Sequence, residues 1–199
     1  MNGTETLRTF VGIPLSGGAR EAVLALQERF RRGLSDERVV KMERALNLHL
    51  TLQVLGDTPR DRLADVSAAV ARVAAGQRAF DLVLASPDVF GGKQPRVLVV
   101  KAGAGGELLE AIQAALSREL EVLGFEPERR EYTPHLTFGR VRRGRQLRRA
   151  EADRLAAAAV EVTRGATMEV AELVHFESQL SPEGATYSRL ASHPLASRP

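Results

Sequence analysis

Apolar and polar residues alternate with two different periods along this chain, and the two periods interleave. Residues 7–15 (LRTFVGIPL) have the composition of a strand, and the segment that follows places Val23, Leu26 and Phe30 at helical spacing. The same strand-then-helix order recurs further along. Additional strands are predicted at 46–57, 80–90, 95–102, 132–141, 167–178 and 185–191, and additional helices at 59–73, 109–123 and 146–160.

Turn and cap residues mark the ends of these elements. Thr58 and Pro59 predict the cap and first turn of the second helix, and Gly124 predicts the end of the third. The turn-prone stretch GGKQP separates the strands at 80–90 and 95–102, and residues 192–199 are expected to form a loose tail. Strand and helix segments therefore interleave twice, which predicts an α+β protein with two similar lobes.

No linker rich in Pro, Gly or Ser separates these lobes, so residues 1–199 are expected to form a single domain. The best candidate boundary is the glycine-rich stretch 101–107. Its glycines lack the spacing and the following acidic residue of a dinucleotide-binding fingerprint, and we interpret it as a turn.

One three-residue motif occurs twice, once in each predicted half. His49 and Thr51 lie in LNLHLTLQVLGD, and His135 and Thr137 lie in YTPHLTFGRV. Since side chains alternate across a strand, each His–Thr pair should share one face. The other face should carry Leu48, Leu50, Leu52 and Val54 in the first strand, and Leu136 and Phe138 in the second.

Two histidines and two hydroxyl groups in one cleft would suit metal-free cleavage of a phosphodiester. A neutral imidazole can take a proton from water while a protonated one gives a proton to the leaving oxygen. The threonines could stabilise the growing phosphate charge. A lone strand histidine is more often structural, but only four histidines exist here and two share this motif. His175 and His193 are interpreted as structural, and no His–Glu or paired-carboxylate motif points to a metal.

Composition and charge narrow the function further. With 44% hydrophobic and 27% charged residues the chain is of ordinary globular type. Cysteine is absent, which excludes disulfides and thiolate catalysis. Neither a signal peptide nor a membrane-spanning run is visible, so a cytoplasmic protein is expected.

The formal charge of +3 is unevenly distributed. Residues 129–149 hold eight arginines against one acidic residue, Glu131, which is a net charge of +7, and the rest of the chain carries −4. Such a basic segment suggests a phosphate-bearing partner, although arginines scattered over a solvated face would look the same.

Four segments of the chain resemble the 2H phosphoesterases: NLHLTLQVLGD, PRVLVV, RREYTPHLTFGRVR and LVHFESQLSPEGATY. The resemblance is to the branch known as 2′-5′ RNA ligase or RNA 2′,3′-cyclic phosphodiesterase, and it extends over nearly the whole chain. It implies a bilobal, pseudo-twofold fold in which two antiparallel-type sheets flanked by helices surround a central cleft. It also implies a substrate, which is RNA ending in a 2′,3′-cyclic phosphate or a small cyclic nucleotide. We further expect a monomer that needs no cofactor or metal.

The resemblance also implies roles for single residues. His49 would protonate the leaving 3′ oxygen, His135 would activate water, and Thr51 and Thr137 would bind the phosphate. The family often has an arginine five residues before the second histidine and an aromatic residue soon after it, which Arg130 and Tyr132 match. Arg140 matches another frequent position. An undistorted strand would point Arg140 away from His135, and only a bulge at Gly139 would bring it back.

Two other functions remain open at this point. The same site could run the reverse reaction and join a cyclic phosphate end to a 5′ hydroxyl, although abundant water favours hydrolysis. A noncatalytic RNA-binding module could use the basic segment alone. With 5% aromatic residues and no tryptophan, however, the chain offers few surfaces for base stacking.

Overall fold

The computed structural model describes residues 5–127, 130–182 and 184–198, and its strands form one curled antiparallel sheet. Nine strands run in the order β7-β4-β5-β6-β3-β1-β8-β9, with β2 beside β6. The strands are β1 (Thr6–Pro14), β2 (Val40–Met42), β3 (His49–Pro59), β4 (Phe80–Phe90), β5 (Val97–Ala102), β6 (His135–Val141), β7 (Thr167–Val170), β8 (Glu172–Ser181) and β9 (Gly184–Pro194). The helices are α1 (Gly17–Gly33), α2 (Leu63–Ala75), α3 (Gly106–Val122), α4 (Arg149–Ala158) and α5 (Val160–Thr163), with short 3₁₀ turns at Glu37–Val39, Ala45–Asn47 and Arg60–Arg62.

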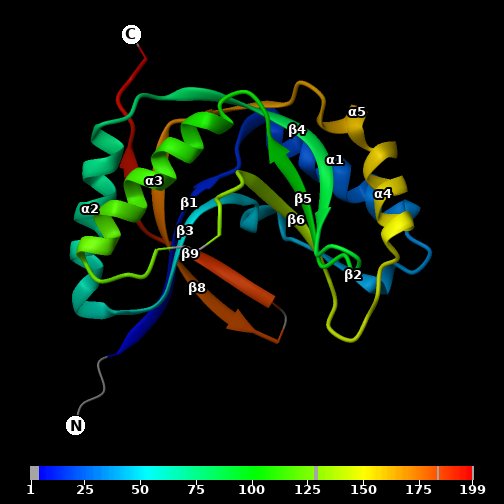
Figure 1. Cartoon of the computed structure of the whole chain (residues 1–199), viewed down its shortest axis with the longest axis horizontal. Coiled ribbons are helices and arrows are strands. Elements are labelled where there is room, and N and C mark those ends of the chain that lie inside the picture. The colour runs from blue at the N-terminus through cyan, green and yellow to red at the C-terminus, as the bar shows by residue number, and fades with distance from the viewer. Residues whose placement is uncertain (1–4, 128–129, 183, 199) are drawn as a thin grey trace.

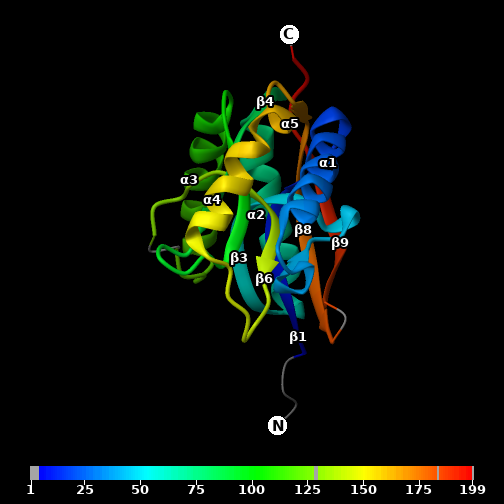
Figure 2. The same ribbon diagram turned by 90° about the vertical axis from the view of Figure 1, so that its right-hand side faces the viewer.

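The sheet consists of two halves that meet at the two motif strands. The first half contains β3, β1, β8 and β9, and the second half contains β7, β4, β5, β6 and β2. Strand β3 joins β6 through the pair Leu50↔Leu136, the residues that directly follow the two motif histidines. The two expected sheets are therefore fused into one. The sheet is curled, with β7 and β4 toward one end and the β8–β9 hairpin at the other (Figures 1 and 2).

Two helices cross between the halves. Helix α1 follows β1 of the first half yet packs on β6 and β7 of the second, whereas α3 follows β5 of the second half and packs on β3 of the first. Figure 1 shows the result: α2 and α3 cover one end of the sheet, and α1, α4 and α5 cover the other. Each crossing helix buries the apolar stripe expected from its sequence, such as Leu26 and Phe30 in α1 and Ile112 in α3.

The hydrophobic core lies between these helices and the convex face of the sheet. Leu50 and Leu136 are both fully buried there, so the leucine-backed face predicted for each motif strand is confirmed at these positions. Within the described ranges no helix has the length and apolar character that crossing a bilayer would need.

Four details differ from the sequence prediction. Thr58 and Pro59 do not start a helix but end β3, because they pair with β1 and because the buried hydroxyl of Thr58 lies 2.8 Å from that of Thr9. Helix α2 starts later, at Leu63. The predicted strand 167–178 is two strands: β7 pairs with β4 in one half of the sheet, and β8 pairs with β1 in the other.

The other two differences concern the Ala-rich helix and the chain end. The predicted helix 146–160 is divided at Ala159 into α4 and α5. The expected loose tail is mostly ordered, since β9 continues to Pro194 along β8 and the side chain of Leu195 is buried. Pairing with a neighbouring strand and burial of a leucine outweigh the local turn preferences of these residues.

Candidate active site

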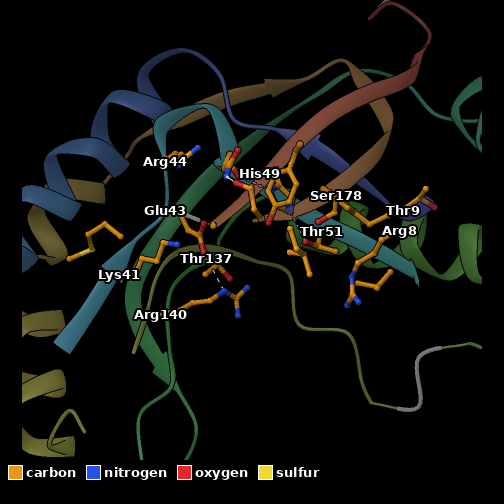
Figure 3. Close-up of a pocket in the computed structure, with 18 of the residues that line it drawn as sticks. Arg8, Thr9, Lys41, Glu43, Arg44, His49, Thr51, Thr137, Arg140 and Ser178 are labelled. Carbon is orange, nitrogen blue, oxygen red and sulfur yellow. Dashed lines mark hydrogen bonds and ion pairs between the residues drawn. The ribbon is translucent and has the colours of Figure 1, made fainter. Parts of the chain in front are cut away.

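A pocket of about 450 Å³ opens on the concave face of the sheet, where the two halves meet. It brings together both predicted pairs: His49 and Thr51 from β3, and His135 and Thr137 from β6. Arg140 also lines it, as expected for a strand distorted near Gly139. Figure 3 shows Thr51 and Thr137 between Lys41, Glu43 and Arg140 on one side and Arg8 on the other.

Matching bulges in the two motif strands decide which side chains reach this pocket. Along β1, Val11 pairs with Gln53 and Gly12 with Thr51, so Leu52 is passed over. Along β5, Leu98 pairs with Gly139 and Val99 with Thr137, so Phe138 is passed over. Each bulge lies three residues after its histidine, and the burial patterns of the two strands are the same over their first six residues.

A bulge reverses the alternation of side chains beyond it. The fifth residue after each histidine is therefore exposed and lines the pocket: Val54 in the first strand and Arg140 in the second. The sequence prediction that Val54 faces the core was wrong for this reason. Arg140 lines the pocket because of the bulge in β6, which is the condition that the sequence analysis set for it.

The two histidine rings are held in the same way by backbone carbonyls. Nδ1 of His49 lies 2.6 Å from the carbonyl oxygen of Asn47, and Nδ1 of His135 lies 2.6 Å from that of Thr133. A carbonyl oxygen can only accept, so Nδ1 carries the proton in both rings. In the neutral form, Nε2 of each ring is then the free base. For His49 this atom lies 2.9 Å from the hydroxyl oxygen of Thr51.

The surroundings of the two rings differ. His49 packs among Phe10, Phe176 and Tyr187, with the Phe10 ring centred 4.8 Å away, whereas His135 meets Phe90 edge-on at 4.9 Å. Burial lowers the pKa of His49 below its ordinary value, and the charge of Arg140 acts in the same direction. The hydrogen bond to the Asn47 carbonyl partly opposes this effect. His49 therefore has a more strongly apolar environment than the sequence alone showed.

Cationic side chains surround the mouth of the pocket. Lys41, Arg44 and Arg140 line one side, and Arg8 of β1 lines the other. Arg140 is held by Glu43, whose carboxylate lies 3.3 Å from its Nε. Arg8 thus brings a guanidinium to the half of the sheet whose own motif strand has Val54 in place of an arginine. An anion in this pocket would meet positive charge from both sides.

Two other residues expected at the site lie differently. The hydroxyl of Tyr132 donates a hydrogen bond of 3.0 Å to the backbone carbonyl of Thr51, and its ring packs against the core. Burial raises the pKa of this phenol far above its usual range. Tyr132 therefore ties the segment before β6 to the first motif strand. Arg130 is exposed in the bend before β6 and is not among the described residues that line the pocket.

Several lining residues were not identified from the sequence as functional. Arg8, Phe10 and Tyr187 belong to segments predicted only as strands, and Asn47 precedes the first motif by two residues. No sequence signal marks Asn47, because its contact with the ring is made by the backbone carbonyl, which every residue has, and the corresponding residue before His135 is Thr133. The side chain of Asn47 also donates to the carbonyl of Ala185 at 2.8 Å, which anchors the β8–β9 hairpin at the pocket.

The donor atoms near the pocket suit anion binding better than metal binding. In the described parts of the chain no group of three or more His, Asp or Glu side chains is arranged to hold a metal ion. Each motif ring offers one nitrogen, Nε2, to the pocket, and guanidinium and hydroxyl groups supply the other polar contacts.

Comparison with known proteins identifies relatives of this arrangement. The family model described as 2'-5' RNA ligase superfamily matches residues 22–178. The RNA 2',3'-cyclic phosphodiesterase of Methanothermobacter thermautotrophicus is 31% identical over 92% of this chain and 95% of its own length. A protein of the same name from Geobacillus stearothermophilus is 31% identical over 96% of this chain, which spans 58% of that relative.

The fold has a counterpart among solved structures. The crystal structure of TT0787 of Thermus thermophilus superposes with a TM-score of 0.77 at 24% identity, covering 96% of this chain and 99% of the other. The expected α+β architecture is thereby confirmed.

Proposed function

Because the chain belongs to the 2′-5′ RNA ligase superfamily, we propose that it hydrolyses 2′,3′-cyclic phosphate ends of RNA by acid–base catalysis between its two motif histidines. The observation that carries this proposal is the paired geometry: two imidazoles in the same tautomer, each held at Nδ1 by a backbone carbonyl, in one cation-lined pocket. The names of the relatives support the substrate class.

The proposed reaction is an in-line displacement at phosphorus. His135 Nε2 takes a proton from water as the water oxygen attacks, and the bond between phosphorus and the 3′ oxygen breaks. His49 Nε2–H gives its proton to that 3′ oxygen. One P–O bond forms and one breaks, and the product carries its phosphate on the 2′ oxygen. A base and an acid on opposite sides of a phosphate suit this geometry because attacking and leaving oxygens lie in line.

Threonine and arginine groups would stabilise the charge that grows on phosphorus. Thr51 and Thr137 share the pocket with the two rings, and their hydroxyls can donate to non-bridging oxygens. Arg140 is the proposed guanidinium partner of the phosphate, with Arg8 opposite it. Contacts of Arg130 and Tyr132 with substrate remain predictions, and for Tyr132 they would involve the ring because the hydroxyl is bonded to Thr51.

The division into acid and base rests on the family resemblance. The lowered pKa of His49 makes its imidazolium a stronger acid, which favours proton donation, but also makes that form rarer in the free protein. A bound phosphodiester anion would stabilise the imidazolium against this effect. Substrate binding would thus help to load the proton that the reaction uses.

A second hollow suggests where an RNA chain continues beyond the pocket. About 270 Å³ in volume, it lies between the β4–β5 turn and the start of α4. Its lining has five cationic side chains and no acidic one in the described part of the chain; the five are Lys93, Arg96, Arg145, Arg148 and Arg149. The hollow joins arginines of the basic segment 129–149 to two cations from elsewhere, and such a cluster would hold backbone phosphates without reading sequence.

The direct test is turnover of a short oligonucleotide ending in a 2′,3′-cyclic phosphate, with the product compared by chromatography with 2′- and 3′-phosphate standards. We expect mainly the 2′-phosphate. Mainly 3′-phosphate would overturn the roles given to the two histidines. Added 5′-hydroxyl oligonucleotide probes the reverse reaction, and joined product as the main outcome would favour a ligase. Binding without any turnover would leave an RNA-binding module.

A further inference from the structure

A buried glutamine on the crossing helix α1 contacts the bulge that directs Arg140 into the pocket. Gln27 is 8% exposed, and its side-chain Nε2 donates to two backbone carbonyls, of Phe138 at 2.9 Å and of Glu43 at 2.8 Å. Phe138 is the bulged residue of β6. A bulged residue is left out of the regular strand ladder, so its polar groups need other partners.

The same glutamine also fixes the partner of Arg140. The amide of Glu43 donates to the carbonyl of Phe138 at 3.0 Å, and the carboxylate of Glu43 pairs with Nε of Arg140. Gln27 therefore joins, through one NH₂ group, the backbone of the bulge and the backbone of the residue that holds the guanidinium. This contact lies next to both features that place Arg140: the bulge that directs its side chain, and Glu43, which pairs with its Nε.

The other half of the sheet has a related arrangement with a different outcome. Gln113 of the other crossing helix, α3, donates its Nε2 to Oε1 of the buried Gln53 at 3.1 Å, next to the bulge at Leu52. The residue that this bulge directs into the pocket is Val54, which has no charge to position. Gln113 can therefore serve as the control for Gln27, because the bulge beside it directs an uncharged residue into the pocket.

We propose that Gln27 is a positioning residue, which acts on the phosphate through Arg140 by fixing the bulge of β6 and the backbone of Glu43. The proposal deepens the proposed function, since it takes Arg140 as the phosphate contact. It assigns α1, which belongs in sequence to the first half, a part in assembling the site of the second half. Gln27 itself touches no reacting atom.

The test is a double-mutant cycle between Gln27→Met and Arg140→Gln, with kcat/KM on the cyclic-phosphate oligonucleotide and Kd for inorganic phosphate as readouts. Alone, Gln27→Met should lower kcat/KM and raise the Kd for phosphate, each by about tenfold. The reason is that a misplaced guanidinium loses about one charge-assisted hydrogen bond. In the Arg140→Gln background the same change should have little effect. Gln113→Met should act equally with and without Arg140.

The outcomes separate this proposal from the proposed function. If Gln27→Met and Arg140→Gln act independently, Gln27 has only a structural role and the proposal is wrong. The proposal is also wrong if Arg140→Gln leaves phosphate affinity unchanged. Should Gln27→Met fail to fold, Gln27→Asn keeps the amide but shortens its reach, and it should show the same dependence on Arg140. Absence of turnover by the wild type would instead overturn the proposed function, while phosphate affinity would still test Gln27.

Discussion

His175 should make the stability of this protein sensitive to acid, and the size of the effect follows from its environment. The residue lies in β8, is 1% exposed, and its Nε2 has no hydrogen-bond partner among the described residues. It pairs with Val11 of β1 and Ala191 of β9. Burial lowers its pKa to about 4, and the nearby charge of His193, which contacts Ser67 of α2, adds to this effect.

The sign and size follow from proton linkage. In the unfolded chain His175 has its ordinary pKa of 6.5, so between pH 6.5 and about 4 the unfolded state binds more protons than the folded state. The free energy of unfolding therefore keeps the full contribution of the neutral His175 ring above pH 6.5, and this contribution is lost as the pH falls through the folded pKa. At about 1.36 kcal/mol for each pH unit, the full loss is about 3 kcal/mol, of which about 2 kcal/mol occurs between pH 7 and pH 4.5.

Replacing His175 by Met removes the titrating group while keeping an apolar side chain of similar size. The free energy of unfolding in urea should be measured at pH 7 and pH 4.5 for the wild type, His175→Met and, as a control, the less buried His193→Asn. Carboxylates titrate in this range too, but they do so in all three proteins. His175→Met should lose about 2 kcal/mol less than the wild type, and His193→Asn should differ less. An equal loss in His175→Met and the wild type would refute this reading of the buried ring.

Three further predictions concern the site. Gly12→Ala should lower kcat strongly, because the added Cβ would lie 2.7 Å from the carbonyl oxygen of Leu50 and 3.3 Å from Cδ2 of His49. Gly18→Ala, where the added Cβ has open surroundings, should leave kcat unchanged, and equal kcat values for the two variants would contradict this steric argument. Replacing Lys93, Arg145 and Arg148 by Gln should raise KM for an oligonucleotide more than for a cyclic mononucleotide and flatten its salt dependence, and equal effects would reduce these cations to surface charge. Activity should persist in EDTA, and loss that one added metal restores would contradict a mechanism run by imidazoles alone.

The features that the sequence could predict depend on local patterns. Period-two and helical spacing located most strands and helices, and the repeated His–Thr pairs in leucine-rich strands predicted two polar faces that share one cleft. Leu50 and Leu136 are buried behind those faces, as such a pattern requires. These properties are set within a few residues of each position.

The features that the sequence could not predict depend on partners far along the chain. Thr58 has the local chemistry of a helix cap, but pairing with β1 places it in a strand. The alternation pattern places Val54 in the core, because no residue near it in the sequence indicates the bulge at Leu52. That bulge exists only in the pairing of β3 with β1. The exchange of α1 and α3 between the halves, and with it the contact of Gln27 with Phe138, depends on three-dimensional packing in the same way.

The central claim, acid–base catalysis by a pair of histidines, is tested most directly by single-turnover rates of His49→Ala and His135→Ala on an oligonucleotide ending in a 2′,3′-cyclic phosphate, with His193→Asn as the control. Removing a general acid or a general base typically costs about 10²–10⁴ in rate. We predict losses of that size for both variants and a near-wild-type rate for the control. A near-wild-type rate for either His49→Ala or His135→Ala, in a folded protein, would contradict the mechanism.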